Sequence, residues 1–438
     1  MRGVFVGCLS VFLFTLTFAA PQERFVDVVV SLNPDLAPGY HLGNQQAAAG
    51  IAHSLGISPR HVYGTALYGF AARVSEGRLE GLRRSPLIDS VSIDGKVSVP
   101  PRAAAPPWCR DNPDHPACSD DGGGDTTGQT IPWGVARIGA DLNANEGAGI
   151  HVYVIDTGVD SDHRDLQANL GNGAAVQTCK GKGCNQSWDD DNGHGTHVAG
   201  TIGAIDNDVD VLGVASQVTL HAVKVLSKSG SGSFSGVIAG VDWVANETAN
   251  RGQPSVANMS LGGGGSKSGT CTSSGFTGDD NLHKALCNAK NKGVVFVVAA
   301  GNNGTDAASS VPAAYDDAVI TVSATNQGDD WPSWSNWGDG VAFWTSNVSA
   351  PVAIAAPGVD ILSTWNDGKT NTTSGTSMAT PHVAGTAALY LAGNSQAADG
   401  NAFSNTRSAL LTTAESSDSF SNSSGNPHAE DFADATSQ

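Results

Sequence analysis

From residue 133 onward the sequence contains a series of short apolar runs, each about as long as one β-strand. They are HVYVID, VTLHAVKVL, SVANMSL, GVVFVVAAG, AVITVSA and VAIAAPG, and most end in Gly, Asp, Ser or Asn. Stretches with helical spacing, such as residues 235–248 and 281–293, lie between several of them. Apolar strands that alternate with helices predict a buried sheet. The expected fold class is therefore α/β, with a mostly parallel sheet, helices on both faces, and functional groups just after the strands.

Residues 25–99 have a different pattern. RFVDVVVSL indicates a strand, LGNQQAAAGIAHSLG a helix, VYGTALYGFAARV a strand, EGRLEGLRRSP a short helix and LIDSVSIDGKVSV a last strand. This β-α-β-α-β order predicts a small α+β module in front of the α/β domain. The Pro-rich PPRAAAPP and the Gly/Asp-rich SDDGGGDTTGQ follow it and indicate a linker.

The first twenty residues, MRGVFVGCLSVFLFTLTFAA, run from one Arg through an apolar stretch to small residues. This layout predicts a secretory signal peptide over residues 1–20; an uncleaved membrane anchor is the alternative. We therefore expect a secreted, extracellular protein that has no membrane attachment once the signal is removed. The net charge of −19 argues against binding to nucleic acid or to anionic membranes. Solubility and bound Ca²⁺ are two explanations of the acidity.

Cys8 would leave with the signal peptide, and an even number of cysteines remains. In an oxidising compartment this predicts disulfides rather than a zinc site, because the sequence has no C-x-x-C pair. Six cysteines allow fifteen pairings, and proximity along the chain favours 109–118, 179–184 and 271–287. The candidates are Cys109, Cys118, Cys179, Cys184, Cys271 and Cys287.

Three polar residues stand in Gly- and Thr-rich motifs. Asp156 follows HVYVI in D-T-G, His194 lies in D-N-G-H-G-T-H-V-A-G, and Ser377 lies in G-T-S-M-A-T-P-H-V-A-G. A serine hydroxyl is a poor nucleophile unless a base takes its proton, and the base needs a carboxylate to orient it. The set therefore predicts nucleophilic catalysis by serine. The amides at the start of the helix after Ser377 would favour a developing negative charge.

His194 and His197 are three residues apart, a spacing that also allows a metal site on one helix face. No third ligand follows at the spacing of H-E-x-x-H, so we interpret His197 as a packing residue. His382, five residues after Ser377, is interpreted in the same way.

Together with S-L-G-G and A-A-G-N, these motifs make the segment from about 133 to 395 similar to the subtilisin-like serine proteases. Within these subtilases it resembles the proteinase K-type and related bacterial branches. The resemblance implies that Asp156 orients His194, that His194 is the general base and that Ser377 is the nucleophile. Asn302 and the Ser377 amide would form the oxyanion hole. The implied substrate groove is walled by Ser260, Leu261, Gly262, Ala299, Ala300 and Gly301, with residues 231–233 as its other edge.

The 25–99 unit resembles the inhibitory prodomain of the same family. The implied organisation is a signal peptide over 1–20, the prodomain over 21–104 and a catalytic domain with an N-terminal extension over 105–438. The processing cut would fall between 99 and 128, either within PPRAAA or near Gly128. The family implies polypeptide substrates, inhibition by the enzyme's own prodomain, no nucleic-acid partner and a monomer.

No cofactor is implied for the chemistry, but structural Ca²⁺ is. The sequence assigns no ligands to it, and we interpret the acidic residues 189–191 as a solvated loop rather than a metal site.

The function implied is a broadly specific endopeptidase, made as a self-processing zymogen, that prefers apolar or aromatic residues before the cut. One alternative is a processing protease that cuts after basic residues. It would need carboxylates in the pocket walls, and SLGGGGSKSGT, residues 260–270, has none. A non-catalytic binding relative would lack part of the motif set, which is present in full.

Overall fold

The computed structural model describes residues 23–36, 44–100, 128–338 and 351–438, except Lys182. The predicted signal peptide, and the candidate pair Cys109 and Cys118, lie outside these residues.

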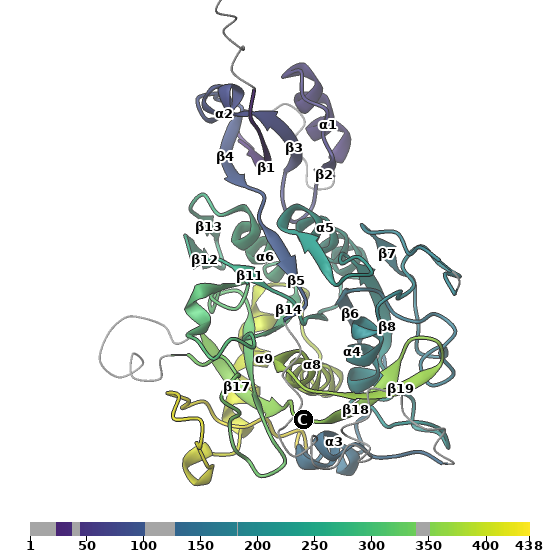
Figure 1. Cartoon of the computed structure of the whole chain (residues 1–438). Coiled ribbons are helices and arrows are strands. Elements are labelled where there is room, and N and C mark those ends of the chain that lie inside the picture. Colours follow the sequence, from purple (N-terminus) through teal and green to yellow (C-terminus); the bar gives the residue numbers. More distant parts are fainter. Residues whose placement is uncertain (1–22, 37–43, 101–127, 182, 339–350) are drawn as a thin grey trace, which may run out of the picture.

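The six apolar runs form neighbouring strands of one seven-stranded sheet (Figure 1). In sheet order the strands are β17 (Val352–Pro357), β16 (Ile320–Thr325), β14 (Val294–Ala299), β10 (Ser255–Met259), β6 (His151–Asp156), β8 (Thr219–Lys224) and β7 (Ala174–Ala175). All of these pairings are parallel. Strands β8 and β7 lie on one side of β6, and β10, β14, β16 and β17 follow one another on the other side. The direction in which strands are added therefore reverses between β6 and β10. Ligands of open parallel sheets bind beyond the carboxyl ends of the strands at such a reversal.

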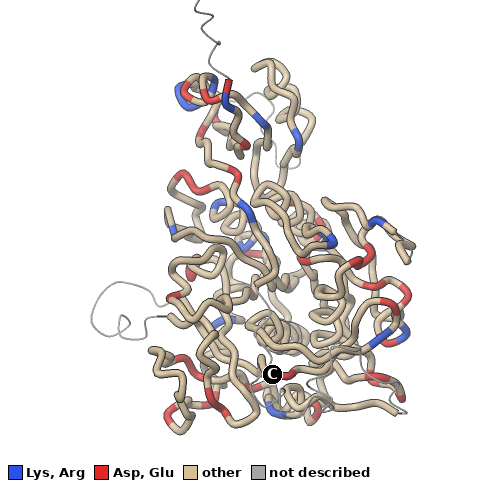
Figure 2. Tube along the Cα trace, in the orientation of Figure 1, with Lys and Arg blue, Asp and Glu red and all other residues tan. Residues whose placement is uncertain are grey.

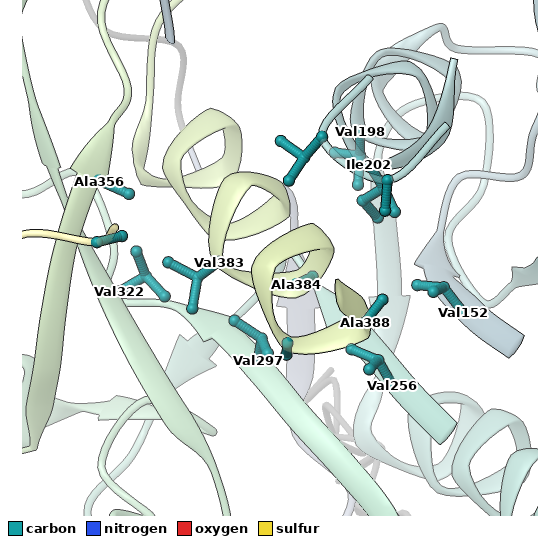
Figure 3. Packing of buried hydrophobic residues seen from close by; sticks show 14 of the residues in the cluster. Val152, Val198, Ile202, Val256, Val297, Val322, Ala356, Val383, Ala384 and Ala388 are labelled. Atoms are coloured by element: carbon teal, nitrogen blue, oxygen red, sulfur yellow. The ribbon is translucent and has the colours of Figure 1, made fainter. Parts of the chain in front are cut away.

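Helices cover both faces of this sheet, because alternate side chains of each strand point to opposite sides. Val152 and Val154 of β6 pack in a cluster with α4 (His194–Gly203) and α8 (Thr376–Gly393). Tyr153 and Ile155 pack on the other face in a cluster with α5 (Phe234–Arg251) and α6 (Asn281–Lys290). Figure 3 shows α8 lying between the sheet and α4. The predicted α/β fold class is confirmed.

The N-terminal unit is a four-stranded antiparallel sheet with two helices. The strand order is β2 (His61–Tyr63), β3 (Gly69–Ser75), β1 (Phe25–Leu32) and β4 (Ile88–Ile93), with helices α1 (Gln45–Ser54) and α2 (Glu76–Arg83). Two predicted strands are each divided in two. VYGTALYGFAARV covers most of β2 and of β3, and the last strand breaks after β4, so that β5 (Lys96–Ser98) leaves this sheet.

This unit rests on α5 and α6 (Figure 1). The Asp242 carboxylate of α5 accepts hydrogen bonds from the main-chain N–H groups of residues 64–67 in the turn between β2 and β3. The amide of Asn281 in α6 donates to the Val29 carbonyl at 2.9 Å and accepts from Ser90 Oγ at 2.8 Å. The contact surface is therefore held by buried polar groups as well as by apolar packing.

Smaller elements complete the described chain. They are α3 (Trp133–Arg137), β9 (Ser231–Ser233), β11 (Gly263–Gly264), β12 (Thr270–Thr272), β13 (Gly275–Thr277), β15 (Ser310–Val311), β18 (Ile361–Trp365), β19 (Lys369–Thr373) and α9 (Gly400–Thr413), with 3₁₀ turns at Ala140–Leu142, Ala307–Ser309 and Ser417–Ser419. Disulfides join Cys179 to Cys184 and Cys271 to Cys287, the two described pairs that proximity favoured.

Asp and Glu outnumber Lys and Arg, 42 to 23, and Figure 2 shows Asp and Glu along many loops of the larger α/β unit. Within the described ranges, no helix has the length and apolar character needed to cross a membrane.

Candidate active site

The predicted acid and base lie side by side. Asp156 is the buried last residue of β6, and His194 is the first residue of α4. His194 Nδ1 is 2.8 Å from Asp156 Oδ1. An ionised carboxylate can only accept, so Nδ1 carries the proton. In the neutral imidazole this leaves Nε2 as the nitrogen that can take a proton from a nucleophile.

Gly193 turns the chain into α4. Its φ is +108°, in the left-handed region that favours glycine, and an added Cβ would lie 2.2 Å from the Trp365 ring. The main-chain N–H of His194 donates to Asn192 Oδ1 at 3.2 Å. The backbone before the histidine is therefore specified by a glycine and by a local side-chain cap.

Two of the three acidic residues before the histidine are buried and Asp191 is half-buried, which corrects the expectation of a solvated loop. Asp189 is 1% exposed and Asp190 8%. Asp190 Oδ1 accepts from the N–H groups of Asn192 and Gly193 and from Thr157 Oγ1, at 2.9–3.0 Å. Its Oδ2 accepts from the N–H and the hydroxyl of Thr196, at 2.9 and 2.7 Å. One carboxylate thus joins the start of α4 to the residue after Asp156.

We expect Asp190→Asn to lower kcat by about 10- to 100-fold with little change in KM, because an amide cannot accept all of these bonds and hydrogen bonds to charged groups contribute about 1.5–3 kcal/mol each. The measurement is steady-state hydrolysis of a short peptide. Asp208→Asn, an exposed carboxylate in the loop after α4, is the matched control. An Asp190→Asn enzyme as active as this control would contradict the role of Asp190.

Ser377 lies in the first turn of α8, which follows the turn Ser374–Gly375. In an α-helix the Ser377 carbonyl would accept from the N–H of residue 381, but Pro381 has none. The carbonyl instead accepts from Ser260 Oγ at 2.8 Å. The Ser377 hydroxyl donates to the Ser260 carbonyl at 3.3 Å. The nucleophile candidate is therefore bound to the residue that follows β10.

Asn302 follows β14, and its side-chain oxygen accepts from the N–H and the hydroxyl of Thr376, at 2.9 and 2.8 Å. What the side chain can offer a substrate is therefore its Nδ2 donor. Gly375 lets the Asn302 side chain lie close to the start of α8, because an added Cβ at Gly375 would lie 2.9 Å from Asn302 Nδ2. The Ser377 N–H belongs to the first turn of α8, whose amides have no partner within the helix.

His194, Asn302 and Ser377 line one cavity of about 90 Å³. An adjoining cavity of about 520 Å³ contains five of the six predicted groove residues, Leu261, Gly262, Ala299, Ala300 and Gly301. The sixth, Ser260, is fully buried, does not line this cavity and contacts Ser377. Among the described residues that line the larger cavity, none is charged.

The two other motif histidines are buried and lie outside these cavity linings. Burial lowers the pKa of His197 to about 3 and that of His382 to about 4. His197 Nε2 is 3.0 Å from the Ile361 carbonyl, and His382 Nδ1 is 2.8 Å from the Met378 carbonyl. Both are neutral side chains: His197 links α4 to β18, whereas His382 contacts a carbonyl of its own helix, α8.

Lys224 is a site residue that the sequence analysis did not select. It ends β8, is fully buried, donates to the Thr157 carbonyl and pairs with Asp191 Oδ1 at 2.6 Å. Its position inside the apolar run VTLHAVKVL was the available signal, because a lysine within such a run must be buried with a partner.

The acidic cavity beside the histidine loop does not fit a metal ion. It is lined by Asp160, Asp162, Asp189, Asp190, Asp191 and Asp367 among others. The two oxygens of Asp189 accept the N–H groups of Ser161 and Gln186, and those of Asp160 accept main-chain N–H groups too. In the described part of the chain, no group of three or more His, Cys, Asp or Glu could hold a metal. Structural Ca²⁺ stays a prediction.

A parallel sheet that gathers an acid, a histidine and a serine beyond its carboxyl edge is the arrangement of a serine hydrolase. The model of the Subtilase family, Peptidase_S8, matches residues 147–431, and the chain belongs to this family. It is thus a serine endopeptidase, as the sequence motifs predicted.

Known relatives agree with this assignment. The chain is 40% identical over 365 residues to "Subtilisin-like serine protease AsES" of Sarocladium strictum, covering 81% of this chain and 78% of that protein. It is 40% identical over 332 residues to "Extracellular serine proteinase" of Thermus sp. (strain Rt41A), covering 75% and 68%. A solved cold-adapted subtilisin-like serine proteinase superposes with a TM-score of 0.54 at 38% identity, over 70% of this chain and 98% of that one.

Proposed function

We propose that this chain is a secreted endopeptidase that hydrolyses polypeptides through Asp156, His194 and Ser377 and that is made as a self-processing precursor. The observation that carries this proposal is that His194, whose Nδ1 is 2.8 Å from Asp156 Oδ1, lines one cavity together with Ser377 and Asn302. No cofactor takes part in this chemistry.

The mechanism follows from these positions. His194 Nε2 takes the Ser377 hydroxyl proton as Oγ attacks the substrate carbonyl, and the Asp156 carboxylate stabilises the imidazolium that forms. The Asn302 Nδ2 group and the Ser377 N–H stabilise the oxyanion. His194 then gives the proton to the leaving nitrogen, and water completes hydrolysis by the same route.

The N-terminal unit is the inhibitor in this proposal, and residues 21–104 are its expected extent. Support comes from β5, which pairs antiparallel with β9, while Ser98 pairs with Gly262 on its other side. An added strand of this kind binds through main-chain hydrogen bonds, as an extended substrate would. A bound β5 therefore excludes other polypeptides from the groove.

The residue before the cut, P1, should be apolar or aromatic, although many residues should be accepted. The larger cavity offers backbone, methyl and hydroxyl groups, so burying a Phe or Leu there is favourable at about 25 cal/mol per Å², whereas an unpaired Lys or Arg charge is costly. Profiling cleavage of a denatured proteome measures this preference.

Thr305 lines the same cavity and offers a matched pair of variants. Thr305→Asp should add cleavage after Lys and Arg, because the new carboxylate would pair with their charge, and the uncharged Thr305→Asn should not. Wild-type cuts confined to sites after Lys or Arg would contradict the apolar preference and favour a processing protease.

A further inference from the structure

Asn336 is a fully buried residue that binds the loop containing Asn302, and it lies in the segment that follows β16. Its Nδ2 donates to the Ala300 carbonyl at 2.9 Å. Its Oδ1 accepts from the main-chain N–H groups of Asn303 and Thr305, at 2.9 and 3.1 Å. One side-chain amide therefore contacts the backbone on both sides of Asn302.

The main chain around Asn336 adds to this contact. The Asn336 N–H donates to the Gly301 carbonyl at 2.9 Å, and the Gly304 N–H donates to the Trp334 carbonyl at 2.8 Å. Gly301 has a φ of +109°, and an added Cβ there would lie 2.5 Å from Asn336 Nδ2. Glycine at position 301 thus provides both the left-handed backbone and the space that the Asn336 amide occupies.

Residues 301–305 form no helix or strand, so no regular ladder of main-chain bonds fixes their position. The start of this loop is attached to the sheet, because the Ala300 N–H donates to a β16 carbonyl at 3.0 Å. The segment that carries Asn336 is attached to the same strand, since Ser335 Oγ accepts from the Ala324 N–H at 3.0 Å. Asn336 therefore fixes the loop relative to β16.

Asn302 is held from two directions. Thr376 of α8 holds the oxygen of its side chain, and the bonds of Asn336 hold the backbone before and after it. An oxyanion donor acts only when it lies within hydrogen-bond distance of the place where the negative charge develops. A displacement of about 1 Å can cost roughly 100-fold in rate, so the backbone position of Asn302 matters as much as its side-chain direction.

We propose that Asn336 is a positioning residue for the oxyanion hole, which acts on catalysis through the backbone of Asn302. Its partners are one carbonyl and two N–H groups, and a neutral side-chain amide supplies both the donor and the acceptor that they need. The inference rests on the proposed role of Asn302 and adds the group that keeps this donor in place.

The first test is Asn336→Ala, matured at an engineered cleavage site for an unrelated protease between residues 105 and 127. We expect kcat on a peptide with Ala at P1 to fall about tenfold or more while KM stays within about twofold, because the oxyanion forms only in the transition state. A small P1 residue keeps contacts with the pocket wall to a minimum.

Asn326→Ala, matured in the same way, is the matched control. The Asn326 side-chain oxygen also accepts two main-chain N–H groups of the segment after β16, those of Gly328 and Asp330, but these bonds stay within its own turn. This control should keep kcat within about twofold of wild type. An Asn336→Ala enzyme as active as the control would overturn the proposal.

The second test is a double-mutant cycle with Asn302. Asn302→Ala alone should lower kcat by about 10²- to 10³-fold, the loss seen when subtilisin loses its oxyanion-hole asparagine. In this background Asn336→Ala should lower kcat by less than about twofold more, because the donor that it positions is gone. If Asn336→Ala costs its full factor in both backgrounds, its effect does not pass through Asn302 and the proposal is wrong.

Circular dichroism at the assay temperature shows whether each variant is folded. If Asn336→Ala does not fold, the same cycle is run with Asn336→Ser, whose hydroxyl can still bond one of the three main-chain partners. If Asn302→Ala keeps kcat within about twofold of wild type, the proposed oxyanion role of Asn302 is wrong, and this inference is wrong with it. If Asn302→Ala shows its expected loss but the Asn336 variant behaves as the control does, only this inference is wrong.

Discussion

Ser377→Ala should lower kcat/KM by roughly 10⁶-fold, the size of the loss when subtilisin loses its serine, and should leave the precursor uncut. Without Oγ there is no nucleophile for His194 to activate, and only binding and oxyanion stabilisation remain. The measurements are the mass of the secreted chain and hydrolysis of a peptide. Removal of residues 25–99 at the normal rate would show that the cut does not depend on Ser377.

Kinetics on this variant require a maturation route that does not use its own activity. A recognition sequence for an unrelated protease, placed between residues 105 and 127, provides one, and wild-type enzyme treated identically is the reference. Ser374→Ala is the matched control, because Ser374 lines the same cavity three residues earlier and its hydroxyl contacts Asp360 instead. The control should retain most of the activity.

Asp156→Asn should lower kcat by about 10⁴-fold with little effect on KM. Asp156 Oδ1 accepts from both His194 Nδ1 and the Thr157 N–H, at 2.8 and 2.7 Å, so an asparagine oxygen can keep both contacts. The negative charge is lost, and with it the stabilisation of the imidazolium. If the amide of the new asparagine rotates so that its NH₂ group faces His194 Nδ1, it stabilises the tautomer that carries its proton on Nε2. That tautomer cannot accept the serine proton.

The same engineered maturation route gives the kinetics of Asp156→Asn. A neutral peptide substrate separates kcat from KM, and circular dichroism shows whether the fold is intact. A folded variant with kcat within about tenfold of wild type would contradict a role for the Asp156 charge in the reaction.

The sheet was predictable because its strands are buried on both faces and therefore apolar throughout. The polar hairpin β18–β19 and the two-residue edge strand β7 lack that signal, and neither was predicted. β5 shows another limit. Alternation in SVSIDGKVSV predicts an extended chain, but nothing local says that residues 96–98 pair with Ser231–Ser233, because pairing partners are set by the packing of the whole molecule.

The proposed acid, base and nucleophile were found by motif, whereas the groups that hold them were not. Asp190 and Lys224 are buried charges, and charged residues are ordinarily exposed, so composition and spacing point away from them. Lys224 pairs with Asp191, 33 residues away in sequence. Such pairs become visible only once β8 and the histidine loop are in place.

The contact between Pro381, Ser377 and Ser260 has a consequence for engineering this enzyme. Because Pro381 has no N–H, the Ser377 carbonyl accepts a hydrogen bond from Ser260 Oγ instead. Ser260 therefore supports both the wall of the groove and the nucleophile. Replacing residues near 260 to redesign specificity would move the serine as well, and turnover would fall together with the old preference. Thr305 lines the same cavity, and its main-chain N–H donates to Asn336 Oδ1 rather than to residues near 260, so we expect redesign at Thr305 to change substrate choice while turnover is preserved.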